Sequence, residues 1–232
     1  MRRALSILGA VALLATLSAS SARPQTAAYS ELSGGAIGSG AEAVDGVVAR
    51  IQDDILTESE LRELSAFQML VDGHEKTRSE LIGELSDQWI VRGEAAAAKY
   101  PEPSPEDVDR AYAQLEKQFH SAEEFKSRCS AVGLTEAAVR RELREQLYLS
   151  RFLDFRFRPA AQIEDEQIAD YYKTEFEPQL KKRGAAVPPM ENVEDTIREV
   201  LVLRAINDRA TAWLDDTRKQ LKIDVLPESS ER

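Results

Sequence analysis

Histidine, cysteine and paired carboxylates are the side chains whose types could support catalysis or bind a metal ion. The chain has two histidines, His74 and His120, and one cysteine, Cys129. No two of them stand at the spacing of metal ligands, so we expect neither a metal ion nor a cofactor. Each histidine falls at a predicted helix boundary, where a solvated polar residue or a cap is the simpler interpretation.

The other candidates for chemistry have ordinary structural explanations. Cys129 follows Arg128, which would favour a thiolate, yet a buried small apolar residue is the more common use of a lone cysteine. Asp107 and Asp109 point to different sides of a predicted helix and cannot act as a pair. The glycine-rich residues 33–40 precede a predicted strand, the wrong order for a nucleotide-binding loop. We therefore expect no catalytic residues.

The first residues have the pattern of a secretory signal peptide. Two arginines are followed by the apolar run Ala4–Leu17 and by small residues that end at Ala22. A membrane anchor is the alternative, but the run is shorter than the ~20 residues that span a bilayer. We expect residues 1–22 to be removed near Ala22, which predicts an exported, periplasmic protein without stable membrane insertion.

Composition restricts the partners of the mature chain. Without Arg2 and Arg3 it carries 28 basic and 41 acidic side chains, a net charge of −13. Such a surface argues against nucleic-acid binding. A single cysteine cannot form an internal disulfide, so stability depends on the core. Residues 23–42 are rich in glycine and serine, which predicts a flexible linker or simply an irregular mature N-terminus.

Helix signals dominate from Thr57 onward. Thr57 with Glu60 forms a capping box, and so does Ser121 with Glu124. Ser104–Pro105 supplies an N-cap and a proline at the first helical position, and Thr135 caps a long helix. Apolar spacing and these signals predict helices over residues 57–71, 75–99, 105–119, 121–133, 135–157, 164–176 and 191–221.

Two strand signals stand at opposite ends of this helical chain. Residues 44–51 form an apolar run, a polar turn follows at residues 52–54, and Ile55–Leu56 then leads into the first helix. Residues 223–226 have an alternating pattern. Because a lone strand leaves its backbone groups unpaired, we expect the two strands to pair. The predicted fold class is mainly α, with a small antiparallel β element from strands near the two ends.

The order of several short motifs resembles the N-terminal chaperone domain of SurA-type periplasmic proteins and their PrsA-like relatives. The motifs are VDGVVARIQDDILTESEL, LIGEL, PSPEDVDRAY, SAEEFKSRCSAVGLTEAAVRRELREQL, IEDEQIADYY and WLDDTRKQLKIDVL. None is specific alone, but their order is, and together they cover most of residues 43–226. The resemblance implies a multi-helix fold of the trigger-factor/SurA peptide-binding type.

The resemblance also implies a domain organisation. Residues 43–158 would form the helical chaperone core, and residues 191–226 the returning helix and closing strand, before a polar tail at 227–232. Between them, residues 159–190 form a connecting helix and loop where many relatives carry a parvulin prolyl isomerase domain. Only residues 176–191 lie at that place, too few for a folded domain, so we expect no isomerase chemistry.

The function implied by the resemblance is that of a holdase for unfolded or nascent secreted and outer-membrane polypeptides, bound in an apolar cleft between the helical core and the terminal lobe. An ordinary place in the core is the alternative for each candidate side chain, because aromatic residues at helical spacing usually face inward. The candidate peptide-binding residues are Phe67, Met69, Trp89, Tyr148, Phe152, Phe155 and Trp213.

Two rival functions stay open at this point. One is a prolyl isomerase with residual or unusual activity, and the other is an adaptor with one fixed protein partner. The sequence also leaves homo-oligomer formation open.

Pairing of the terminal strands gives the first testable prediction. Deleting residues 222–232 should lower the melting temperature of the whole domain, because the N-terminal strand loses its partner. Thermal unfolding followed by circular dichroism measures this. An unchanged melting temperature would contradict the pairing.

Overall fold

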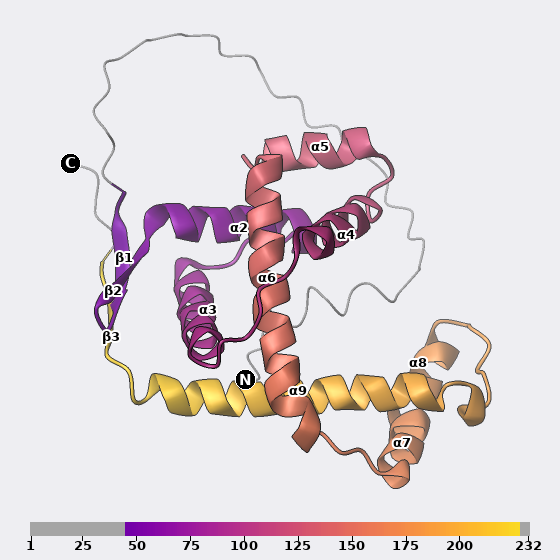
Figure 1. Ribbon diagram of the computed structural model, residues 1–232. Helices are drawn as coiled ribbons and strands as arrows, with labels where there is room; N and C mark the ends of the chain where they lie inside the picture. The colour runs from indigo at the N-terminus through magenta and orange to yellow at the C-terminus, as the bar shows by residue number, and fades with distance from the viewer. Residues whose placement is uncertain (1–44, 228–232) are drawn as a thin grey trace.

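The computed structural model describes residues 45–227. The predicted signal peptide at 1–22, the predicted linker at 23–42 and residues 228–232 of the predicted tail lie outside these residues. None of the helices in the described part is long and apolar enough to cross a membrane. The fold is mainly helical, with one small antiparallel sheet at an edge of the molecule (Figure 1).

The sheet confirms the predicted pairing of the two end strands and adds a third strand. Strand β1 (Val47–Ile51) lies in the middle, between β2 (Asp54–Thr57) and β3 (Ile223–Val225). Ile51 stands opposite Ile223 in the β1–β3 register. Strand β2, which the sequence did not predict, pairs with the other edge of β1.

Strand β2 was missed because its turn carries no glycine signal. Ile51 and Asp54 are cross-strand partners, so Gln52 and Asp53 alone make the connection. Two-residue hairpins need positive φ angles, which asparagine or glycine usually supplies. Here Gln52 adopts a φ of 54°. The residues that were expected to lead directly into the first helix, Ile55 and Leu56, therefore belong to a strand.

The first five described helices follow the predicted order. Their bounds are α2 (Glu58–Asp72), α3 (Arg78–Ala97), α4 (Pro105–Glu116), α5 (Ala122–Ala131) and α6 (Glu136–Phe157). The capping box of Thr57 and Glu60 is present, and Ser104 and Thr135 cap α4 and α6. The box expected at Ser121 is only half formed, because the Glu124 carboxylate accepts a hydrogen bond from the His120 N–H instead.

The connecting segment is more helical than expected. Helix α7 (Asp165–Tyr171) continues through a π-helical turn at Tyr172–Phe176 into α8 (Glu177–Lys182). Pro178 does not end the helix at residue 176; it lies directly after the π-helical turn, at the start of α8. Short 3-10 turns lie at Arg158–Ala160 and Met190–Asn192. Helix α9 (Glu194–Arg218) then spans about 37 Å.

Three buried clusters connect these elements, and α6 contributes to two of them. Side chains of α2, α3 and the sheet form one cluster, and α2, α4, α5 and α6 form another. The third, between α3, α6 and α9, contains Val91, Leu149, Phe152, Leu153 and Leu214. Figure 1 shows α9 along the base of the molecule, from α7 and α8 at one end to the sheet at the other.

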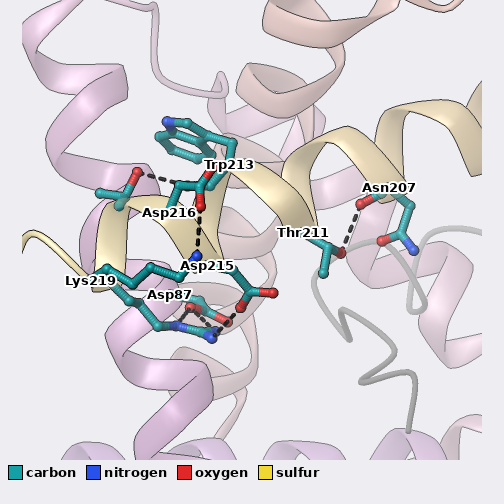
Figure 2. Close-up of polar contacts among 9 residues, drawn as sticks. Asp87, Asn207, Thr211, Trp213, Asp215, Asp216 and Lys219 are labelled. Atoms are coloured by element: carbon teal, nitrogen blue, oxygen red, sulfur yellow. Dashed lines mark hydrogen bonds and ion pairs between the residues drawn. The ribbon is translucent and has the colours of Figure 1, made fainter.

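A nearly buried ion pair fixes α9 to α3. The Arg218 Nε donates to Asp87 Oδ1 at 2.7 Å, and the Asp87 side chain is only 7% exposed. Arg218 also pairs with Asp215 on its own helix. Figure 2 shows the Asp87 and Asp215 side chains close to one another. Burial raises the pKa of Asp87, and the Arg218 hydrogen bonds oppose that rise. The pair therefore holds the end of α9 against α3, just before the chain enters β3.

This pair can be tested against a neighbouring exposed pair. Asp87→Asn should lower the free energy of unfolding by about 2 kcal/mol, because the partly buried Arg218 keeps only Asp215. Asp216→Asn is the control: the Asp216–Lys219 pair is more than 70% exposed on both sides, so its loss should cost under about 0.5 kcal/mol. Urea unfolding measures both, and equal effects would show that the Asp87 pair has no special role.

Candidate functional site

Partly buried aromatic side chains surround the cluster between α3, α6 and α9. We call this set the aromatic rim. Its members are Trp89, Tyr100, Tyr148, Phe157 and Trp213. They come from three helices and one loop that are distant in sequence, so the rim exists only once α9 has packed against α3 and α6. It places large apolar surface around the edge of one helical interface.

Tyr100 connects this rim to Phe155, an exposed aromatic residue of α6. Its ring centroid lies 5.3 Å from that of Phe155, 5.6 Å from Phe152 and 6.1 Å from Tyr148. The Tyr100 hydroxyl donates to the Arg151 carbonyl at 3.2 Å, which fixes the ring on α6. Phe155 is 61% exposed. A fixed aromatic pair thus presents apolar surface to solvent.

Trp213 forms another part of the rim. Its ring lies 5.8 Å from that of Phe157. The Arg156 guanidinium carbon stands 4.7 Å from the Trp213 ring centroid, in a cation–π contact. Arg156 is also paired with Glu94 of α3 at 3.1 Å. The charged side chains partly cover Trp213, which makes this part of the rim less apolar than the surface at Phe155.

The structure brings some of the predicted peptide-binding residues together and separates others. Trp89, Tyr148 and Trp213 belong to the rim, and Phe155 contacts it through Tyr100. Phe152 is fully buried beneath the rim. Phe67 is fully buried in the α2–α4–α5–α6 cluster, and Met69 is partly buried on α2.

Two rim residues were missed by sequence reasoning. Tyr100 stands just before the prolines that end α3, and its contacts with α6 are all distant in sequence. Phe157 is the last residue of α6. The spacing of aromatic residues along one helix cannot show which side another helix will cover, so no local signal identified them.

A hollow of about 480 Å³ lies next to the rim, between β2 and α3. We call it the Trp89 hollow. The Trp89 indole N–H donates to Asp54 Oδ2 at 2.8 Å and so joins α3 to the first residue of β2. Its lining residues are Asp54, Ile55, Leu56, Glu60, Leu85, Gln88, Trp89, Arg92, Gly93 and Ala96. Ile55 is 51% exposed, whereas Leu56 and Leu85 are buried.

Charged groups surround the hollow unevenly. Asp54 and Glu60 supply carboxylates, and Arg92 is the single cation on the lining. The Arg92 guanidinium is already paired with Glu145 of α6 at 2.7 Å. The lining therefore has an excess of negative charge over an apolar floor.

Glu142 lies buried on α6, close to this ion pair. Burial, together with the nearby carboxylates Glu145 and Glu63, raises the pKa of its carboxyl group to about 7. The Gln146 amide, whose Nε2 lies 3.5 Å from Glu142 Oε1, and the Arg92 charge oppose the rise only weakly. At neutral pH this group sits near its midpoint.

The side chains considered for chemistry have structural partners. Cys129 is buried, and burial raises the pKa of its thiol, which disfavours the reactive thiolate. His74 Nδ1 lies 2.7 Å from the Asp72 carbonyl oxygen, and His120 Nδ1 lies 2.8 Å from a Glu124 carboxylate oxygen. Within residues 45–227, no three His, Cys, Asp or Glu side chains are grouped so that they could hold a metal ion.

Glu142 predicts a pH-dependent stability. A carboxyl group whose folded pKa lies above its unfolded value stabilises the fold below pH 4.5, and this contribution is lost as pH rises through about 7. Glu142→Gln stays neutral, so it should be more stable than the wild type by about 3 kcal/mol at pH 8 and nearly equal at pH 4. Urea unfolding at both pH values measures this.

The control is Glu102→Gln, which changes an exposed loop carboxylate and should have little effect at either pH. A Glu142→Gln effect that does not depend on pH would contradict the raised pKa.

Comparisons with known proteins identify relatives. The chain is 28% identical over 159 residues to the chaperone SurA of Cupriavidus pinatubonensis and 29% identical over 169 residues to that of Ralstonia nicotianae. These matches cover 65% and 69% of this chain but 31% and 32% of the relatives, so the chain spans about a third of their length. No family model matches.

A solved structure adds a comparison of shape. One chain from a study of PEB4 and Cj1289, two SurA-like chaperones of Campylobacter jejuni, aligns with a TM-score of 0.47 and 9% identity, over 78% of this chain and 99% of that one. The sequence matches above confirm the resemblance that the order of motifs indicated. Over about two thirds of its length, the chain is similar to SurA chaperones.

Proposed function

We propose that the protein is a periplasmic holdase, which binds unfolded secreted or outer-membrane polypeptides through apolar surface and does not isomerise prolines. The observation that carries this proposal is the similarity to two SurA chaperones over about two thirds of the chain. Those relatives are named chaperones, and the matches span about a third of their length.

The aromatic rim supplies the surface that such binding needs. Removing apolar client surface from water drives association without a specific pocket. Phe155 is 61% exposed although Phe152, three residues earlier, fills the core beneath it. Tyr100 holds the Phe155 ring in place, so little side-chain freedom is lost when a client contacts it. The rim thus offers preorganised apolar contacts.

Charge and binding strength fit a holding function. The whole chain carries a net charge of −11, which opposes self-association of a protein with exposed aromatic groups. A client that is held by shallow apolar contacts also dissociates readily, because each contact stabilises the complex by only a small amount. In this proposal, a client leaves when it folds or binds elsewhere, and nucleotide hydrolysis has no part in its release.

Two assays separate this function from its rivals. An aggregation assay with a chemically unfolded client at equimolar ratio should show suppression by the wild-type chain; if aggregation proceeds unchanged, the holdase proposal is wrong. A proline-peptide isomerisation assay should show only the uncatalysed rate. A rate above background would favour the isomerase alternative, and suppression limited to one client would favour an adaptor.

Phe155 gives the sharpest test of the proposed surface. Phe155→Ser should weaken client binding by about two- to fivefold, since an exposed aromatic contact is lost, while the melting temperature should change little. Arg144→Ser is the matched control, because Arg144 is an exposed residue of the same helix. Light scattering during client dilution measures both. If both variants suppress aggregation like the wild type, the surface at Phe155 does not bind clients.

A further inference from the structure

Strand β2 forms an open edge of the sheet. The strand order is β2-β1-β3, so within residues 45–227 no strand lies on the far side of β2. Edge strands carry backbone groups that can pair with another chain. The direction of those groups follows from the observed hydrogen bonds of the middle strand.

Successive residues of β1 direct their backbone hydrogen bonds alternately to β3 and to β2. The Gln52 N–H donates to the Lys222 carbonyl, and the Val48 carbonyl accepts from the Leu226 N–H, so even-numbered positions pair with β3. The odd-numbered residues Ala49 and Ile51 then pair with Leu56 and Asp54 of β2.

The residue between these two partners on β2 is Ile55. Its N–H and C=O therefore point away from β1, toward the open edge. No backbone hydrogen bond to Ile55 from outside the sheet occurs among the described residues. One donor and one acceptor are thus available at the same residue, which is the pair that an added antiparallel strand requires.

The Trp89 hollow lies along this edge. Asp54, Ile55 and Leu56 all contribute to its lining, together with Leu85 and Trp89 of α3. Side chains of an added strand alternate between the two faces of the sheet. The residue opposite Ile55 would face solvent with it, and its two neighbours would place their side chains beside Asp54 and Leu56, over the apolar floor of the hollow.

The other edge is less suited to an added strand. Strand β3 has three residues, and the charged side chains Lys222 and Asp224 lie on or beside it, 3.2 Å apart. Charged residues on an edge strand discourage pairing with a further strand. Strand β2 instead has Ile55 half exposed at its open edge and an apolar hollow beside it.

We propose that β2 binds an extended, positively charged polypeptide segment as an added antiparallel strand, with its alternate apolar side chains in the Trp89 hollow. The charge follows from the lining, where Asp54 and Glu60 outnumber an Arg92 that is already paired with Glu145. Backbone pairing gives affinity for many sequences, and the hollow selects apolar residues at every second position. This proposal deepens the holdase function and rests on it for the origin of the segment.

A peptide probe with backbone methylation tests the proposal on the full-length protein. The probe is a fluorescein-labelled peptide of sequence KVTVTVK, in which the valines face the hollow and one of the two threonines stands opposite Ile55. In this register the threonine N–H groups face β2 and the valine N–H groups face away.

Methylation of the threonine nitrogens should weaken binding by about tenfold or more, since a backbone hydrogen bond is lost and a methyl group is placed at the edge. Methylation of the valine nitrogens should change the affinity of the probe by less than about threefold. Fluorescence anisotropy measures both. Equal effects, or a larger effect at the valines, would overturn the proposal.

A variant of the protein gives an independent measurement. Ile55→Pro removes the N–H at the open edge but leaves the β1–β2 hydrogen bonds intact, a position where proline is tolerated in a sheet. It should reduce binding of the unmethylated probe by about tenfold or more. The control Ile55→Val keeps the N–H and the branched side chain and should bind within about twofold. Equal binding by both variants would also overturn the proposal.

The two proposals can fail separately. If the protein suppresses client aggregation but binds the differently methylated probes equally well, the strand-addition proposal is wrong and the holdase proposal stands. If only threonine methylation weakens probe binding and the protein does not suppress client aggregation, the strand-addition proposal stands and the holdase proposal is wrong.

Discussion

The middle strand of the sheet sets the constraint on which the rest of the fold depends. Strand β1 is buried and has hydrogen-bonding groups along two edges, and a buried backbone group without a partner is costly. The hairpin to β2 satisfies one edge locally. The other edge is satisfied by β3, at the far end of the described chain, so α9 must run back along α3 and α6 to deliver it. The Asp87–Arg218 pair and the packing of Ala210 and Leu214 fix that course.

The candidate surface is a product of this closure. The aromatic rim surrounds the interface that α9 forms with α3 and α6, and Trp89 packs against both that interface and the sheet cluster. Trp89 also hydrogen-bonds Asp54 at the start of β2. One tryptophan therefore connects the rim, the hollow and the open edge of the sheet. The packing of this residue therefore positions all three surfaces.

Local signals predicted much of this fold, and contacts between distant residues account for what they missed. Side-chain caps such as Thr57 and Ser104 placed most helix starts, because a cap is decided within three residues. The pairing of β1 with β3 was inferred because a lone strand would leave its backbone groups without hydrogen-bond partners. Strand β2 was not predicted because the turn before it depends on a positive φ angle at Gln52, and glutamine rarely adopts such an angle. For the site, helical spacing could not distinguish buried Phe152 from exposed Phe155, because tertiary packing alone decides which side of α6 is covered.

The position of β3 has a consequence for the order of folding. A chain that emerges from a ribosome or a translocation channel does so from its N-terminus, and contacts between distant segments form only after both are free. Strand β1 emerges early, but its β3 edge has no partner until residue 225 is out. Up to that moment the nascent chain shows an unpaired strand edge and an incomplete helical interface. A protein that is proposed to protect unfolded chains from aggregation thus passes through a stage in which its own unpaired surfaces are prone to aggregate.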